Sequence, residues 1–247
     1  MAASRTALSC AVLALAGGAA QAVTVNLSRF PYPPIDVVMQ GPAESYTGEA
    51  GQFEGTLLDG GTVLSSSADA RARVLVIGAS PTSFLSYCAE ITQAIQFNTP
   101  YEFQRVEGAA RFGAAKADDL SRLFTAAASF VVDGSTSAAF QSALWEIVYE
   151  HDDVYDLAGG LFTGAPVNPA DAGSAAAFAQ INLFLANLSS YAPLYHVEAL
   201  TNQNVQDLLF ATPLAAVPEP QTWSLLLVGL AAAGWVARRR RTPAAGS

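Results

Sequence analysis

Two side chains of this sequence, the thiol of Cys88 and the amide of Gln141, are of types that can react with each other. The chain contains two cysteines, and Cys10 lies in an N-terminal stretch that we expect to be removed, so Cys88 cannot form an internal disulfide. A thiolate that attacks a glutamine amide expels ammonia and leaves a thioester, which is far more open to attack by amines. Such a bond persists only where apolar and aromatic walls exclude water. Candidate wall residues are Phe84, Tyr87, Trp145 and Tyr149.

The segments around both residues resemble two sequence blocks of bacterial thioester domains. The blocks read SYCAEI and FQSALWEI here, so Cys88, Gln141 and Trp145 match by position. Phe140 replaces a threonine that often precedes the glutamine, and Ala-Leu stands where the family has Ala-Ile. The resemblance implies a thioester between Cys88 and Gln141, supported by Tyr87 and Trp145, that attaches the protein to an amine-bearing target. It also implies β-structure with a helical segment between the two blocks.

Other interpretations of Cys88 stay open. It can be a small buried hydrophobic residue, with Gln141 only hydrogen-bonding in the core, or it can form an intermolecular link. It can also act with His151 or His196 as a cysteine hydrolase, although the sequence has no nucleophile-elbow motif. Rival acyl donors for a thioester are Gln93, Gln96 and Gln180. The first two lie too close to Cys88 in sequence for an easy ring, and the third lacks a following tryptophan.

An acidic run follows the segment that contains Gln141. Its carboxylates are Glu150, Asp152, Asp153 and Asp156, and oxygen ligands at such spacing could bind calcium. The run lacks the glycine and the twelve-residue pattern of an EF-hand, so we interpret it as a solvated helix end. Zinc is disfavoured, because one retained cysteine and two distant histidines form no recognisable ligand spacing. We therefore expect no metal and no cofactor.

The C-terminal region has the layout of a sorting signal. Its first part is Pro218, Glu219 and Pro220, its second is an uncharged apolar run at residues 223–237, and its third is Arg238, Arg239, Arg240 and Arg241. The prolines prevent the helix from running back into this box. The run would form a helix of about 22 Å, short of the roughly 30 Å hydrocarbon core. The arginines would hold the following residues 242–247 in the cytoplasm.

This layout over residues 217–241 resembles the PEP-CTERM sorting signal of Gram-negative bacteria. The resemblance implies recognition by an exosortase at the inner membrane, removal of the tail, and delivery to the cell surface or the extracellular matrix. The alternative is a permanent single-span anchor. The shortness of the apolar transmembrane run and the preceding proline box favour a disposable signal over a durable span.

The N-terminus predicts export as well. Arg5 supplies a basic start, residues 7–19 are mostly apolar, and Ala20-Gln21-Ala22 has the small-x-small pattern that signal peptidase cleaves. Residues 1–22 are therefore expected to be a signal peptide. A lipoprotein modified at Cys10 is less well supported, because that cysteine lies inside the apolar stretch rather than at its end.

Residues 23–216 remain between the two signals, and their length suits one domain or two small lobes. The whole chain has a formal charge of −9, and loss of Arg5 with the tail arginines makes this domain still more acidic. An acidic domain repels nucleic acid and anionic membranes, so we expect no nucleic-acid partner. A hydrophobic content of 51% argues against disorder.

The residue pattern predicts an α+β domain with a sandwich-like core and a helical insertion between the Cys88 strand and the Gln141 helix. Expected strands cover residues 23–26, 52–57, 62–66, 71–77, 84–91, 195–200 and 205–212. Expected helices cover residues 117–130, 138–150 and 174–188, and Ser135 or Ser137 is expected to cap the second of them.

Together these features predict an exported surface or matrix protein without catalytic turnover. We expect it to attach to an amine-bearing target through the thioester. The alternative is a structural protein of the biofilm matrix that binds exopolysaccharide without covalent chemistry, and a cysteine hydrolase ranks third.

Overall fold

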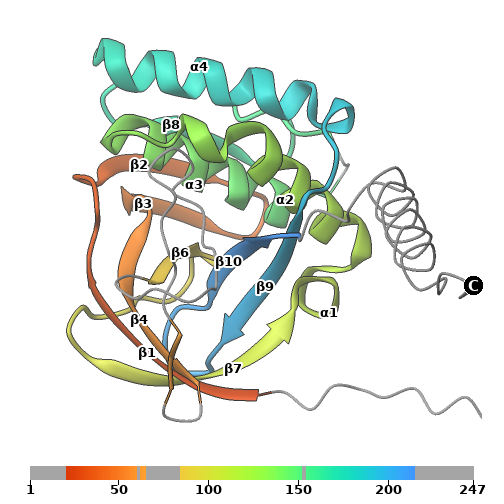
Figure 1. Ribbon diagram of the computed structural model, residues 1–247. Coiled ribbons are helices and arrows are strands. Elements are labelled where there is room, and N and C mark those ends of the chain that lie inside the picture. Colours follow the sequence, from red (N-terminus) through yellow and green to blue (C-terminus); the bar gives the residue numbers. More distant parts are fainter. Residues whose placement is uncertain (1–20, 60–61, 65–83, 152–153, 215–247) are drawn as a thin grey trace, which may run out of the picture. The chain divides into compact units, whose positions relative to one another are not determined.

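A computed structural model describes residues 21–59, 62–64, 84–151 and 154–214 of the chain. Apart from Leu214, these residues lie in the first of the chain's two structural units, Met1–Pro213. An antiparallel barrel forms the base of this unit (Figure 1). Its strands follow the order β1 (Gln21–Arg29), β7 (Pro100–Glu107), β9 (Tyr195–Thr201), β10 (Leu208–Pro213), β6 (Phe84–Cys88) and β4 (Phe53–Asp59), and β4 pairs again with β1.

Apolar side chains from alternate positions fill the barrel. On β1, Val23, Val25 and Leu27 are buried, whereas the residues between them are partly exposed. Their ladder partners on β7 and β4, Phe103 and Leu57, are buried as well. Directly paired residues on neighbouring strands point to the same face of a sheet. This alternation therefore separates an apolar interior from a more polar outer face.

A glycine allows the barrel to close. Gly55 of β4 pairs with Leu27 of β1, next to the point where the register of the two strands shifts. A Cβ atom at this position would lie only 2.3 Å from the carbonyl oxygen of Asn26. Only a residue without a Cβ permits the two backbones to approach this closely.

Helices cover one side of the barrel. They are α2 (Ala114–Ala127), α3 (Gly134–Tyr149) and α4 (Ala172–Ala186), with α4 farthest from the barrel (Figure 1). Tyr87 of β6 points toward this layer, where its ring lies 6.1 Å from that of Phe124 in α2 and 5.0 Å from that of Phe140 in α3. Short helical segments complete the layer: α1 (Gly108–Phe112), η1 (Ala128–Phe130) and η2 (Leu188–Ser190). Strand β6, which carries Cys88, is consequently buried on both faces.

A second, three-stranded sheet contacts α3. It has the order β3 (Ser45–Ala50), β2 (Ile35–Gln40) and β8 (Thr163–Pro166), and all three strands contact that helix. Tyr46 of β3 packs edge-on against Trp145 of α3, with the ring centroids 5.3 Å apart. Helix α3 is thus enclosed by barrel, helices and small sheet together, which explains why it carries almost no polar face.

Asp133 begins helix α3. Its side chain accepts a hydrogen bond from the backbone N–H of Thr136, and the Thr136 hydroxyl interacts in return with the backbone N–H of Asp133, a capping box. The expected caps Ser135 and Ser137 were therefore wrong. Ser137 instead accepts a hydrogen bond from the backbone N–H of Gln52, which ties the helix to the start of β4.

The α+β class is confirmed, and the details of the core differ from expectation. The predicted strands correspond to β1, β4, β5 (Thr62–Leu64), β6, β9 and β10, and the predicted helices to α2, α3 and α4. The described strands form a closed barrel and a small separate sheet where a sandwich-like core was expected. The interval between Cys88 and Gln141 contains the unpredicted strand β7 as well as helices. Strands β2, β3 and β8 were also not predicted, and the expected strand at residues 71–77 lies outside the described residues.

The described part of the chain contains no helix that is both long and apolar enough to cross a membrane. The expected signal peptide, apart from its last two residues, and the apolar run at residues 223–237 lie outside the described residues.

Candidate functional site

The side-chain amide of Gln141 is bound to the peptide backbone of Cys88. The backbone N–H of Cys88 donates to Oε1 of Gln141 at 2.8 Å, and Nε2 of Gln141 donates to the carbonyl oxygen of Cys88 at 2.9 Å. The structure therefore brings these two residues together although they are 53 positions apart in the sequence. The paired hydrogen bonds fix both the position and the plane of the amide.

The amide occupies a place that a neighbouring strand would otherwise fill. Strand β4 pairs with β6 along Phe84–Ser86, and no described strand pairs with the β6 edge beside Cys88 on that side. On the opposite edge, Cys88 is the ladder partner of Leu208 in β10. Gln141 reaches from helix α3 to the open edge and completes the hydrogen bonding of the last residue in the strand.

Burial makes this pair a dry site. Gln141 is fully buried, and Cys88 is only 5% exposed. Burial raises the pKa of the Cys88 thiol far above its ordinary value, although a hydrogen bond from the Gln206 side chain partly opposes that shift. Burial, followed by the nearby Cys88, raises the pKa of Tyr46 to about 12. The thiol is therefore neutral and water-poor, which favours persistence of a thioester over its rapid formation.

The expected aromatic neighbours have different roles. Tyr87 is the neighbour of Cys88 on β6 and so points to the opposite face of the strand. Its hydroxyl accepts a hydrogen bond from Nε2 of Gln52 at 2.9 Å. Trp145 lies one helical turn beyond Gln141, and its buried Nε1 has no hydrogen-bond partner among the described residues. Phe84 packs against Phe210, with ring centroids 5.5 Å apart.

Among the aromatic residues expected to shield the pair from water, Trp145 lies four residues after Gln141 and so on the same side of α3. Tyr87 is a core residue that packs against the helices. Tyr149, the remaining candidate, accepts a hydrogen bond from the backbone N–H of Ile91 at 3.1 Å, three residues after Cys88.

Sequence reasoning missed Gln206. Its side chain hydrogen-bonds to the Cys88 thiol, and its Nε2 also donates to the backbone carbonyl of Glu90 at 2.8 Å. This amide is therefore a rival acyl donor to Gln141 that the sequence analysis did not consider. No sequence signal pointed to it, because its approach depends on the pairing of β10 with β6.

The acidic run organises the backbone around it. Glu150 is fully buried and accepts hydrogen bonds from the backbone N–H groups of Leu161 at 2.9 Å and Phe162 at 3.0 Å. Gly160 lies against it with φ of 91°, and a Cβ there would come within 2.8 Å of the carboxylate. Lys116, the single lysine of the chain, donates to the Glu150 carbonyl oxygen at 2.8 Å. The interpretation of Glu150 as part of a solvated helix end was therefore wrong.

Of the remaining acids of the run, the structure describes only Asp156. Asp156 accepts from the backbone N–H of Ala158 at 2.9 Å and from the side chain of Asn182 at 2.6 Å. Asp152 and Asp153 lie outside the described residues. The expectation that this run binds no calcium stays a prediction.

Among the described residues, neither histidine forms a hydrogen bond with Cys88, whose side-chain partners are Gln141 and Gln206. His196 pairs in the ladder with Thr212, four residues along β10 from Leu208, which is the partner of Cys88. At roughly 3.4 Å per residue, this offset places the histidine about 14 Å farther along the strand. His151 is exposed after the end of α3. The geometry thus gives the cysteine hydrolase no Cys–His pair at His196.

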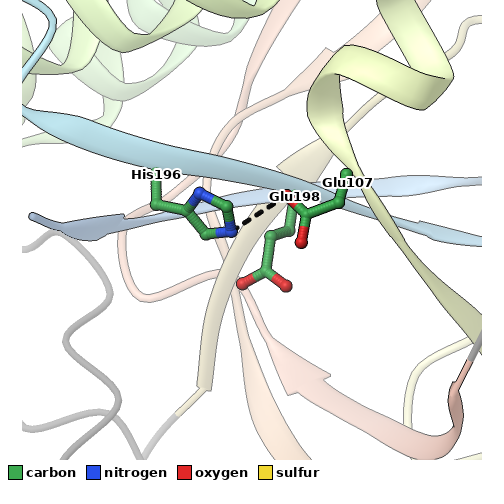
Figure 2. A group of neighbouring side chains, drawn as sticks. All are labelled: Glu107, His196 and Glu198. Atoms are coloured by element: carbon green, nitrogen blue, oxygen red, sulfur yellow. Dashed lines mark ion pairs between the residues drawn. The ribbon is translucent and has the colours of Figure 1, made fainter. Parts of the chain in front are cut away.

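A second cluster of charged side chains lies at the other end of β10. Glu107 of β7 is the direct ladder partner of Glu198 in β9, and His196 lies two residues before Glu198 on the same face. Figure 2 shows the three side chains converging, with Nε2 of His196 3.1 Å from Glu107. Arg105 grips Glu198 through two contacts of 2.6 and 2.8 Å. Sequence analysis did not predict this cluster, because its members come from strands whose pairing could not be predicted.

Comparison with known proteins identifies the C-terminal segment. Residues 216–241 match the PEP-CTERM protein-sorting motif. No curated protein and no solved structure matches the chain. The motif confirms the expected sorting signal at Pro218–Glu219–Pro220 with its arginine cluster, and it indicates export through a membrane-bound exosortase to the cell surface or extracellular space. It covers no part of the domain that carries Cys88 and Gln141.

Proposed function

We propose that this exported protein attaches covalently to an amine-bearing surface or matrix component through a thioester between Cys88 and Gln141. The observation that carries the proposal is the pair of hydrogen bonds that hold the Gln141 amide against the Cys88 backbone. A mere core glutamine would satisfy the same backbone groups, so the covalent step needs its own test.

The proposed reaction is an acyl transfer within the chain. The sulfur of Cys88 bonds to Cδ of Gln141, the bond from Cδ to Nε2 breaks, and the thiol proton leaves with the nitrogen as ammonia. The backbone N–H of Cys88 already donates to Oε1 at 2.8 Å. It is placed to stabilise the negative charge that develops on this oxygen in the tetrahedral intermediate.

Attachment reverses the roles of the groups. A primary amine of the target attacks Cδ of Gln141, the bond to sulfur breaks, and the thiol of Cys88 is released as a new amide forms. Each protein molecule reacts once, so the proposal involves no catalytic turnover. The slight exposure of Cys88 keeps water from competing, while a target must bind closely enough to reach the bond.

Intact mass of the mature protein is the decisive measurement. A closed thioester makes the protein lighter by one ammonia and leaves no titratable thiol after unfolding. Methylamine should then add at Gln141 and release the Cys88 thiol. Cys88→Ala and Gln141→Ala should each abolish the loss of mass.

Two matched variants locate the acyl donor. Gln206→Ala removes the other amide near the thiol, and Gln180→Ala removes an exposed glutamine on α4. Both should keep the loss of ammonia. If Gln206→Ala abolishes the loss of ammonia and methylamine labels Gln206 in the wild type, the acyl donor is Gln206 and the proposal for Gln141 is wrong. Full sequence mass with a titratable Cys88 in freshly purified wild-type protein would remove the covalent function altogether.

The second candidate is non-covalent binding of exopolysaccharide in a biofilm matrix. A polar groove of about 530 Å³ beside β9 and β10 favours it. Residues that line it include Glu102, Gln104, Arg111, Asn202 and Asp207. Amide, carboxylate and guanidinium groups can hydrogen-bond the hydroxyls of a sugar chain. Asn202→Ala with Gln104→Ala should weaken retention on polysaccharide without changing the intact mass.

Sorting by exosortase has a separate test. The mature protein should be found outside the cytoplasm without Arg238–Arg241. Replacing Pro218, Glu219 and Pro220 by alanine should trap the unprocessed chain in the inner membrane. Equal processing of both forms would show that the proline box is not what the enzyme recognises.

A further inference from the structure

We infer that Glu107, His196 and Glu198 form a binding site for a divalent transition-metal ion of the zinc type. One imidazole nitrogen and two carboxylates face one another at the end of the barrel (Figure 2). The site does not depend on the thioester, since it lies at the opposite end of β10 from the partner of Cys88.

The strand ladder brings the ligands together. Glu107 and Glu198 are direct partners on β7 and β9, and His196 shares the face of Glu198 because strand side chains alternate. Like charges directly opposite each other in a ladder are unfavourable. A positive charge close to the two carboxylates therefore relieves their repulsion.

The distances suit a metal after small side-chain rotations. The three ligand atoms lie within 4.8 Å of one another, and Nε2 of His196 is 3.1 Å from Oε2 of Glu107. Zinc bonds to nitrogen and oxygen of about 2.0–2.2 Å place neighbouring ligand atoms roughly 3.4 Å apart in a tetrahedral site. One side chain must therefore move closer by about 1 Å to complete the set.

Arg105 competes with a metal ion for Glu198, and it also holds that carboxylate in place. It donates to both carboxylate oxygens of Glu198, and it neutralises one of the two negative charges. Each carboxylate oxygen has a second lone pair, so Glu198 can bind a metal while the guanidinium holds its plane. Arg105 then acts as a positioning residue, as outer partners of metal ligands commonly do.

The exposure of the two outer ligands allows an ion to reach the site from solvent. The side chains of His196 and Glu107 are 42% and 63% exposed, whereas that of Glu198 is 5% exposed. The ion would thus bind from solvent to the two outer ligands and reach the buried carboxylate behind them. Imidazole together with carboxylates favours zinc, cobalt or nickel over calcium and magnesium.

The test uses the mature protein after treatment with EDTA. Zn²⁺ should raise the melting temperature by binding to the folded state, and Co²⁺ should give visible absorption bands of a protein-bound ion. His196→Gln and Glu107→Gln change exposed side chains and should each weaken Zn²⁺ binding at least about tenfold. His151→Gln and Glu102→Gln are matched controls, because they remove the other histidine and another acid of β7, and both should bind as the wild type does.

Three results would overturn the inference. The first is the absence of any Zn²⁺-dependent shift in the wild-type protein. The second is a shift that His196→Gln and Glu107→Gln retain in full, because the ion would then bind elsewhere. Mg²⁺ in place of Zn²⁺ should give no shift, and an equal response to both ions would indicate nonspecific screening of an acidic protein and equally count against the site.

Discussion

Cys88 and His196 are the ladder partners of residues near opposite ends of β10, Leu208 and Thr212. The two sites to which they belong, the Cys88–Gln141 pair and the Glu107–His196–Glu198 cluster, differ in nearly every physical respect. The first is buried, uncharged and fixed by two backbone hydrogen bonds. The second is charged and half open to solvent. Exclusion of water preserves an acyl bond, whereas access to solvent admits an ion, so one barrel offers two sites with opposite requirements.

The comparison predicts that the buried pair matters far more for stability than the exposed cluster. Gln141→Ala leaves the backbone N–H and carbonyl of Cys88 buried without partners, and each such group costs about 1–3 kcal/mol. The free energy of unfolding should fall by about 2–5 kcal/mol. Urea denaturation in a Cys88→Ala background measures this without interference from a thioester.

Gln180→Ala is the control for that measurement. Gln180 is exposed on α4, and its removal should change the unfolding free energy by less than about 0.5 kcal/mol. Equal losses in both variants would mean that water satisfies the Cys88 backbone, and the description of the site as dry would have to be abandoned.

The raised pKa of Cys88 sharpens the comparison through pH. The ordinary pKa of a cysteine thiol is 9.0, and burial raises the pKa of Cys88 above it. Above pH 9 the thiol therefore stays protonated in the folded protein and ionises on unfolding. Stability from this source is therefore complete below pH 9 and declines as pH rises above it, by about 1.4 kcal/mol per pH unit. Denaturation of the free-thiol protein between pH 8 and 10, compared with Cys88→Ala, measures the decline.

A closed thioester has no thiol to ionise, so it predicts a different outcome. The difference between wild type and Cys88→Ala should then show no dependence on pH over the same range. Tyr87 and Tyr149, whose pKa values are also raised, are present in both proteins and cancel in the difference. Tyr46 keeps burial, the main cause of its raised pKa, in both proteins. A decline in protein whose mass shows the closed bond would contradict the assignment of the pKa to Cys88.

The two regions also show what a sequence can and cannot predict. Local patterns identified the strand of Cys88, the helix of Gln141 and their reactive types, because helix and strand periodicity are short-range signals. They did not give the closure of β4 onto β1, which depends on the close approach at Gly55. Pairing is a long-range property, so sequence reasoning placed neither Gln206 beside Cys88 nor Glu107 beside His196.

Glu150 illustrates a different limit. A carboxylate after an apolar helix is ordinarily solvated, and the sequence therefore indicated an exposed end. The later residues Leu161 and Phe162 turn back and donate their N–H groups to it. These buried N–H groups need an acceptor, and the Glu150 carboxylate provides it inside the protein. No local sequence pattern indicates such a contact.

The response to calcium is expected to differ from the response to zinc, which distinguishes the acidic run from the Glu107–His196–Glu198 cluster. The described oxygens of Glu150 and Asp156 already accept hydrogen bonds, so Ca²⁺ should leave the melting temperature unchanged while Zn²⁺ raises it. The measurement is thermal unfolding with each ion after EDTA treatment. A rise with Ca²⁺ that Asp152→Asn with Asp153→Asn abolishes would establish a calcium site that this comparison does not foresee.

The smallest expected effect concerns the exposed cluster without metal. His196→Gln and Glu107→Gln, measured in EDTA, should each lower the unfolding free energy by less than about 1 kcal/mol, because exposed ion pairs contribute little. The coupling in a double-mutant cycle should be equally small. Arg105→Ala is the contrasting variant, since it strips the partner from the buried Glu198 and should cost more than either. If His196→Gln alone cost more than about 2 kcal/mol in EDTA, the cluster would be a structural ion network. The geometry of the cluster would then be explained without any bound metal. The contrast between the Cys88–Gln141 pair, which stabilises the fold, and a solvent-exposed set of metal ligands would fail.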